Sequence, residues 1–253
     1  SMRLDGLGVF QLLAEAEADD AAPVAPQLFV GRGEQLAALS DAYFAGARCG
    51  MRLVSLHGPS GVGKSALVAR FLEDVAGDAI VLAGRCYEQE SVPYKAFDGV
   101  LDAIARHLAS LDEGTLRDLL PREIGALARV FPVLERLPAI SAVSRDVEAD
   151  PLEIRRRAFD ALRILLSRLG ERQRVVIHID DLQWADLDSV QLLHELVRPP
   201  DPPPFLLIGA WRDGFEGRSA FLDALRGERF RSLSLAVRDS PLGPLTAAES
   251  HAL

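Results

Sequence analysis

Cysteine is scarce in this chain, and long hydrophobic runs are missing from it. The two cysteines, Cys49 and Cys86, form no C-x-x-C pair, so the sequence predicts neither a disulfide framework nor a cysteine metal site. No apolar run approaches the roughly 18 residues that a membrane span needs, and the first residues show no signal-peptide pattern. These absences favour a protein of a reducing, cytoplasmic compartment with no membrane partner.

Basic charge is also in deficit. The chain has 253 residues, with 28 Lys and Arg against 37 Asp and Glu, and a net charge of −9. Such an acidic balance disfavours a broad nucleic-acid-binding surface. Hydrophobic residues make up 49% of the sequence, which is enough for a globular domain with a substantial core.

The most informative feature that is present is the string Gly-Pro-Ser-Gly-Val-Gly-Lys-Ser at 58–65. It matches G-x-x-x-x-G-K-[ST], the P-loop that cradles the phosphates of a nucleotide. The apolar run 51–57 before it predicts a buried strand, and 66–72 after it has helical spacing. The alternative is a glycine-rich strand-to-helix turn without a ligand, which the flanking pattern disfavours.

Each part of this string has a physical role. Glycines let the backbone turn tightly and point its N–H groups at phosphate oxygens, and the helix that follows adds the positive end of its dipole. We expect Lys64 to reach the β- and γ-phosphates as a point charge. The Ser65 hydroxyl is expected to ligate Mg²⁺, which also takes phosphate oxygens and waters.

A second motif follows the apolar run 174–180, which ends in Asp180 and is followed by Asp181. Carboxylates at the end of a core strand are costly to desolvate, and a nearby Mg²⁺ would offset that cost. We therefore expect Asp180 to hold Mg²⁺ opposite Ser65, and Asp181 to polarise the attacking water. The alternative is a strand end at which an aspartate merely caps the next turn.

Other residues near predicted strands have weaker signals. Arg212 follows the apolar run 205–211, so it could contact the γ-phosphate from the carboxyl edge of the sheet, or it could form a structural salt bridge. His57 and His178 are interpreted as satisfied core histidines, Trp184 as a packing residue, and the triplet 155–157 as solvated or structural arginines.

The remaining pattern indicates an α/β protein with a layered sheet. Helical segments separate five predicted strands, which are mostly continuous runs of Val, Ile and Leu typical of parallel strands. The strands are expected at 52–57, 79–84, 174–180, 205–211 and 232–237. The segment 87–173 has an almost entirely helical pattern, and it includes a helix start where Asp150, Pro151 and Glu153 form a capping signal.

Several strings resemble AAA-type ATPase domains. Val30-Gly31-Arg32 resembles the entry of these domains, and 180–186, Asp-Asp-Leu-Gln-Trp-Ala-Asp, resembles the extended Walker B motif of the STAND signal-transduction ATPases. The strings 84–88 and 92–94 are also similar to that group. Within it, the chain is most similar to ATPase regions fused to bacterial Ser/Thr protein kinases, adenylate cyclases and LuxR-type regulators.

This resemblance implies roles for individual residues. Val30, Gly31 and Arg32 would lie near the adenine, Pro244 would approach the base from a helical lid, Asp180 and Ser65 would serve Mg²⁺, and Lys64, Asp181 and Arg212 would serve hydrolysis. The phosphate-binding set would be Gly58, Pro59, Ser60, Gly61, Val62, Gly63, Lys64, Ser65 and Ala66.

The resemblance also implies a fold and a division of the chain. It implies a three-layer P-loop NTPase with a mainly parallel five-stranded sheet in the order 5-1-4-3-2, and a helical insertion between strands 2 and 3. The expected domains are an N-terminal helix and linker at 1–26, which would end an upstream domain, the ATPase domain at 27–240, and the beginning of the lid at 241–253.

The function that we expect is an ATP-binding, slowly hydrolysing switch in a multidomain bacterial signalling protein. Its partners would be an adenine nucleotide, other domains of the same polypeptide and, depending on the nucleotide, further copies of itself. Two alternatives stay open: a scaffold module that binds nucleotide without turnover, and a P-loop small-molecule kinase. The absence of an N-K-x-D string argues against a GTPase.

Overall fold

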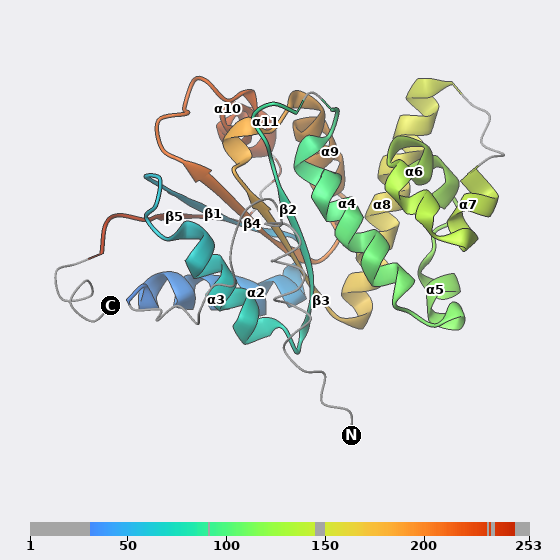
Figure 1. The fold of residues 1–253 in the computed structure, drawn as a ribbon, viewed down its shortest axis with the longest axis horizontal. Helices are drawn as coiled ribbons and strands as arrows, with labels where there is room; N and C mark the ends of the chain where they lie inside the picture. Colours follow the sequence, from blue (N-terminus) through green and yellow to red (C-terminus); the bar gives the residue numbers. More distant parts are fainter. Residues whose placement is uncertain (1–30, 91, 145–149, 232, 234–235, 246–253) are drawn as a thin grey trace.

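A single twisted sheet of five parallel strands organises the protein (Figure 1). The computed structural model describes residues 31–90, 92–144, 150–231, 233 and 236–245. The strands are β1 (Arg52–Gly58), β2 (Ala79–Arg85), β3 (Arg174–Asp180), β4 (Phe205–Arg212) and β5 (Ala236–Pro241). Their order across the sheet is β2-β3-β4-β1-β5, which confirms the predicted 5-1-4-3-2 arrangement.

Helices fill the connections between the strands. They are α2 (Gly33–Cys49), α3 (Lys64–Val75), α4 (Lys95–Ala109), α5 (Glu113–Leu119), α6 (Ile124–Val130), α7 (Pro138–Ser144), α8 (Pro151–Arg172), α9 (Leu187–Val197), α10 (Ala220–Arg226) and α11 (Glu228–Arg231), with short 3-10 turns at Pro132–Arg136 and Leu182–Trp184. The helix expected within 4–18 lies outside the described residues. In the described part of the chain, no helix combines the length and the hydropathy that a bilayer crossing requires.

The core forms two layers, one on each face of the sheet. Side chains of α2 and α3 pack with Val54, Leu56 and Ile208 on one face. On the other face, α4, α8 and α9 pack with Leu53 and Ile177, and Figure 1 shows α5, α6 and α7 beyond them. Alternate residues of a central strand are thus buried on opposite faces, which explains why the runs that form β1 to β4 are mostly apolar rather than alternating.

The first four predicted strands are confirmed to within one residue at each end; the fifth is also present, but its predicted bounds were wrong. The strand begins at Ala236 rather than at position 232, and it continues to Pro241. Leu233, which made the predicted run apolar, lies before the strand and packs against the larger core cluster. β5 itself is an edge strand that is exposed except at Ser240, so its position depends on pairing with β1 rather than on an apolar pattern.

The predicted helical insertion between β2 and β3 is confirmed. Its longest helix, α8, begins as the capping signal indicated, with Pro151 in its first turn and the Asp150 carboxylate accepting from the backbone N–H of Leu152 at 3.2 Å. The Glu153 carboxylate accepts hydrogen bonds from Arg156 and Arg157. Those bonds hold the pKa of Glu153 well below its usual range, at about 2. The arginine triplet is thus structural in part.

Two glycines let the insertion approach the sheet. A Cβ added to Gly99 on α4 would lie 2.8 Å from the Cα of Gly84 on β2, a distance that real Cβ atoms do not adopt. The helix and the edge strand are therefore in backbone contact at this point; a Cβ on Gly99 does not fit, and a Cβ on Gly84 would be tight, with Val100 N at 3.2 Å.

We expect the Gly99→Ala substitution to destabilise the protein. The overpacking should cost about 1–3 kcal/mol, offset in part by the higher helix propensity of alanine, up to about 1 kcal/mol. Urea unfolding would measure the difference. Gly33→Ala is the matched control, because an added Cβ there, also in a helix, meets nothing within 4 Å. A Gly99→Ala protein as stable as the control protein would contradict the backbone contact.

Candidate nucleotide-binding site

The P-loop lies where the sequence predicted it, between β1 and α3 at the carboxyl edge of the sheet. Gly61 and Gly63 have φ values of 75° and 94°, in the left-handed region that favours glycine. Gly63 is the N-cap of α3 and provides no side-chain cap, and the first turn of the helix has no acidic residue. The N–H groups and the positive dipole end of a twelve-residue helix are therefore available to an anion.

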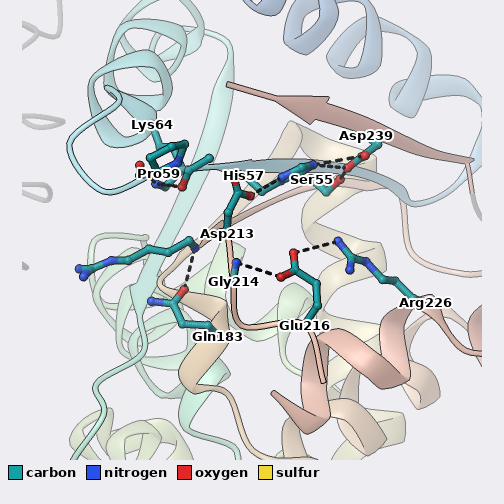
Figure 2. Close-up of polar contacts among 12 residues, drawn as sticks. Ser55, His57, Pro59, Lys64, Gln183, Asp213, Gly214, Glu216, Arg226 and Asp239 are labelled. Carbon is teal, nitrogen blue, oxygen red and sulfur yellow. Dashed lines mark hydrogen bonds and ion pairs between the residues drawn. The ribbon is translucent and has the colours of Figure 1, made fainter. Parts of the chain in front are cut away.

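Lys64 is folded back over this loop (Figure 2). Its side chain is buried, and Nζ donates hydrogen bonds to the carbonyl oxygens of Gly58 and Pro59, each at 2.9 Å. Burial lowers the pKa of Lys64, the nearby Arg212 lowers it further, and the charge of Asp180 opposes both. The ammonium group is thus held at the mouth of the loop by partners that a phosphate oxygen could replace.

Ser65 and Asp180 meet as predicted, although they are 115 positions apart in sequence. The Ser65 hydroxyl donates to Oδ2 of Asp180 at 3.0 Å. The other carboxylate oxygen accepts from the backbone N–H of Asp181 at 2.9 Å, which fixes the orientation of the group. Two oxygen donors beside a phosphate-binding loop fit Mg²⁺, which uses few protein ligands and completes its shell with phosphate oxygens and waters. No group of three or more metal-binding side chains occurs among the described residues.

Asp181 lies deeper, and both of its oxygens are occupied. The residue has a left-handed backbone, with φ of 53°, and is only 7% exposed. Oδ2 is 2.9 Å from Nη2 of Arg85 and 3.1 Å from its Nε. Oδ1 accepts from Nε2 of Gln183 at 2.8 Å and lies 3.4 Å from Nε of Arg212. The structure thus brings Asp181 and Arg212 together, as an ion pair at the carboxyl edge.

Arg85 and Gln183 are contacts that the sequence interpretation missed. Arg85 ends β2, and burial acts to lower its pKa while the hydrogen bond and the charge of Asp181 more than compensate, so the pKa is raised. Gln183 belongs to the string at 180–186. Its amide, two positions from Asp181, was the one feature of the sequence that could have indicated a contact with that carboxylate. Arg85 ends β2, the strand next to β3, and this position could have indicated its contact with Asp181 at the same edge of the sheet.

The residues expected near the adenine are placed in part. Val30 lies outside the described residues. Gly31 and Arg32 both have left-handed backbones, and the Arg32 guanidinium donates to the carbonyl oxygens of Val62 at 3.1 Å and Gly243 at 2.6 Å. Arg32 therefore joins the start of α2 to the P-loop and to the segment that leaves β5, in which Pro244 is exposed.

His57 is not a core histidine but the centre of a polar cluster at the end of β1 (Figure 2). Its Nδ1 lies 2.8 Å from Oδ1 of Asp213 and its Nε2 lies 3.3 Å from Oδ2 of Asp239. Ser55 donates to the other oxygen of Asp239 at 2.5 Å, and the imidazole ring stacks on Trp211 with centroids 5.5 Å apart. The cluster ties β5 and the loop after β4 to the strand that carries the P-loop.

This cluster predicts a pH dependence of stability. Partial burial raises the pKa of Asp239, but hydrogen bonds from Ser55 and His57 outweigh it, so the pKa lies below its usual value of 3.8. A depressed carboxyl pKa contributes stability that is complete above the unfolded value and is lost as the pH falls through the folded value. We expect the free energy of unfolding to fall less in Asp239→Asn than in the unchanged protein as the pH is lowered from about 5 to about 3. Urea unfolding at each pH would measure it. Asp118→Asn on α5 serves as the control, and equal losses in all three proteins would contradict this role.

His178 was expected to be a satisfied core histidine and Trp184 a packing residue, and only the second expectation is fully met. His178 is buried, as expected, and burial lowers its pKa, but Nε2 has no hydrogen-bond partner in the described structure, so the ring is not fully satisfied. Trp184 packs edge-to-face against Phe215 at 4.9 Å, which confirms its packing role. The last acid of the same string, Asp186, accepts from the backbone N–H of Tyr94 at 2.9 Å and thereby holds the start of α4.

Comparisons with known proteins bear on this site. No curated protein matches the sequence. Among the solved structures that match are one of Drosophila ORC bound to DNA (10% identity, TM-score 0.46, covering 96% of this chain and 99% of that chain) and one of Drosophila ORC bound to AT-rich DNA and Cdc6 (12% identity, TM-score 0.44, covering 98% of this chain and 62% of that chain). Likenesses this remote indicate nothing about function. Residues 28–208, which contain the P-loop, Asp180 and Asp181, match the family described as the AAA ATPase domain. With this match over most of its length and with the strand order and P-loop described above, the chain belongs to the family of AAA ATPase domains.

Proposed function

We propose that this chain is an ATP-binding domain that hydrolyses ATP slowly and acts as a nucleotide switch in a multidomain bacterial signalling protein of the cytoplasm. The observation that carries the proposal is the convergence of four groups at one edge of the sheet. Lys64 lies at the loop, the Ser65–Asp180 oxygen pair lies beside it, and Asp181 and Arg212 lie together beyond that pair.

The chemistry of each group supports this assignment. Lys64 and the amide groups of the loop would bind the β- and γ-phosphates. Ser65 and Asp180 would hold Mg²⁺, whose charge offsets that of the phosphates when it is bound. Asp181 would orient and polarise water, and Arg212 would contact the γ-phosphate. Arg32, Gly31 and Pro244 would lie near the base.

The switch part of the proposal concerns what ATP changes elsewhere. A nucleotide can shift a conformational equilibrium only through contacts that differ between ATP and ADP, and Lys64 and Arg212 would make them. We propose the division into 1–26, 27–240 and 241–253, with the last segment beginning a helical lid. Nucleotide-dependent self-association, and contact with kinase, cyclase or regulator domains of the same polypeptide, would follow from movement of that lid.

Titration and turnover of the unchanged protein test the proposal. Calorimetric titration with ATP, ADP and GTP in the presence of Mg²⁺ should give micromolar binding of the adenine nucleotides, about −8 kcal/mol, and no binding of GTP. Steady phosphate release from ATP should accompany it. Binding without release would favour the scaffold alternative, transfer to a metabolite would favour the kinase, and no binding would overturn the proposal. Sedimentation with ATP and with ADP would test the switch.

A further inference from the structure

Gln183 is the buried link between the ends of β3 and β4. The residue lies in the 3-10 turn Leu182–Trp184 directly after Asp181, and it is 3% exposed. Its side-chain nitrogen Nε2 donates to Oδ1 of Asp181 at 2.8 Å. Its side-chain oxygen Oε1 accepts from the backbone N–H of Arg212 at 3.2 Å. One amide thus joins the carboxylate that the proposed function assigns to water polarisation to the backbone of the residue whose side chain it assigns to the γ-phosphate.

The backbone of β4 explains why this link is needed. Pairing between β3 and β4 ends at Ile179 and Gly209, whereas β4 continues beside β1 as far as Arg212. The N–H of Asp213 donates to Gly58 on the β1 side, and that of Arg212 faces the other way. Since β3 ends at Asp180, the Gln183 side chain replaces the missing strand partner of the Arg212 N–H.

The chemistry of the amide fits both partners in one orientation only. An ionised carboxylate accepts and does not donate, and a backbone N–H donates and does not accept. An amide offers a donor and an acceptor on neighbouring atoms, and it satisfies both. A glutamate would place an acceptor against Asp181, and a methionine would remove both of the bonds that the amide makes.

Gln183 also differs from the two arginines that contact the same carboxylate. Arg85 and Arg212 have side chains that are 40% and 43% exposed, and each is a charged group that an anion can attract away. Gln183 is neutral and buried, so a bound phosphate would exert no net electrostatic attraction on its side chain. If Arg212 turned toward a γ-phosphate, the amide would still hold Oδ1 of Asp181 and the backbone of Arg212.

We infer that Gln183 is a positioning residue that fixes Asp181 relative to Arg212 for ATP hydrolysis. The inference rests on the proposed function. It assigns to Gln183 a large effect on turnover and at most a small one on nucleotide affinity, because the amide contacts neither the P-loop nor Lys64 in the described structure. Misplacement of a catalytic group by about 1 Å lowers rates on the order of 100-fold.

The test compares Gln183→Met with Gln191→Met, which makes the same change on the exposed side of α9. We expect kcat for phosphate release to fall roughly 10- to 100-fold in Gln183→Met, while the Kd for ATP stays within about threefold. Hydrogen exchange should show faster exchange at the Arg212 amide, even without nucleotide. Gln191→Met should match the unchanged protein in each measurement.

Gln183→Glu keeps an acceptor for the Arg212 N–H, and it replaces the donor to Asp181 with a second negative charge beside that carboxylate. It should therefore retain slow exchange at Arg212 and still lose turnover, which makes it decisive if Gln183→Met fails to fold. Normal kcat in folded Gln183→Met or Gln183→Glu, with turnover in the unchanged protein, would overturn this inference alone. Loss of affinity and kcat together would indicate a structural role and would also overturn it. No turnover in the unchanged protein would overturn both the inference and the proposed ATPase activity.

Discussion

Replacing Lys64 with alanine is expected to abolish measurable nucleotide binding, with a loss in affinity of at least about 100-fold, or about 2.7 kcal/mol. The ammonium group is buried at the loop, and its bonds to Gly58 and Pro59 place it where phosphate oxygens would arrive. Alanine removes that charge and leaves the loop with only its amide groups and helix dipole. Calorimetric titration of ATP and ADP with Mg²⁺ would measure the loss.

The chain provides a matched control for this change. Lys95 is its only other lysine, and its Nζ also donates to two backbone carbonyl oxygens, those of Tyr87 at 3.4 Å and Glu90 at 3.1 Å. Lys95→Ala removes an equal charge and similar hydrogen bonds from the start of α4, after the edge strand β2. It should bind ATP as the unchanged protein does. Equal affinities in all three proteins would show that Lys64 does not contact phosphate.

Replacing Asp181 with asparagine is expected to lower steady phosphate release about 100- to 10,000-fold, the usual contribution of a positioned proton acceptor, while ATP binding persists. The change removes the charge but keeps the size of the side chain. Since Arg85 and Arg212 both lie against this carboxylate, they would then repel each other. Phosphate release and calorimetric affinity should be measured on the same preparation, and thermal unfolding should be recorded to account for that repulsion.

Asp188→Asn is the control, because Asp188 lies in the first turn of α9 and also carries a negative charge near this edge. It should leave phosphate release unchanged. If Asp181→Asn hydrolysed ATP at the normal rate, Asp181 would be an ion-pairing residue for the two arginines, and the water-polarising role would belong to another group.

Much of the fold could be predicted because its signals are local. Continuous apolar runs marked β1 to β4, and the string at 58–65 fixed the position of one strand-to-helix turn. Ser65 and Asp180 could be predicted to meet because both follow parallel strands, whose carboxyl ends share one edge. β5 could not be predicted correctly, because it is exposed and held by pairing with β1 and by the Ser55–Asp239 bond.

The missed contacts have a common physical reason. Arg85 and Gln183 act through partners that are distant in sequence or through a backbone group, and no periodicity encodes such pairings. His57 was expected to be a core residue because it follows a buried run, yet its ring meets carboxylates from two other segments. The local sequence pattern predicts the strand or helix on which a residue lies. The residues that its side chain contacts depend on how the strands are ordered in the sheet.

The contact between Gly58 and the segment after β5 has a mechanical consequence. The carbonyl of Leu242 lies so close to Gly58 that an added Cβ could not fit, and the Leu242 N–H donates to the His57 carbonyl at 2.7 Å. Arg32 adds a third attachment, from the same loop to Gly243. These three attachments join residues 242–243 to the P-loop, so a displacement of the loop would be expected to displace that segment in the same direction.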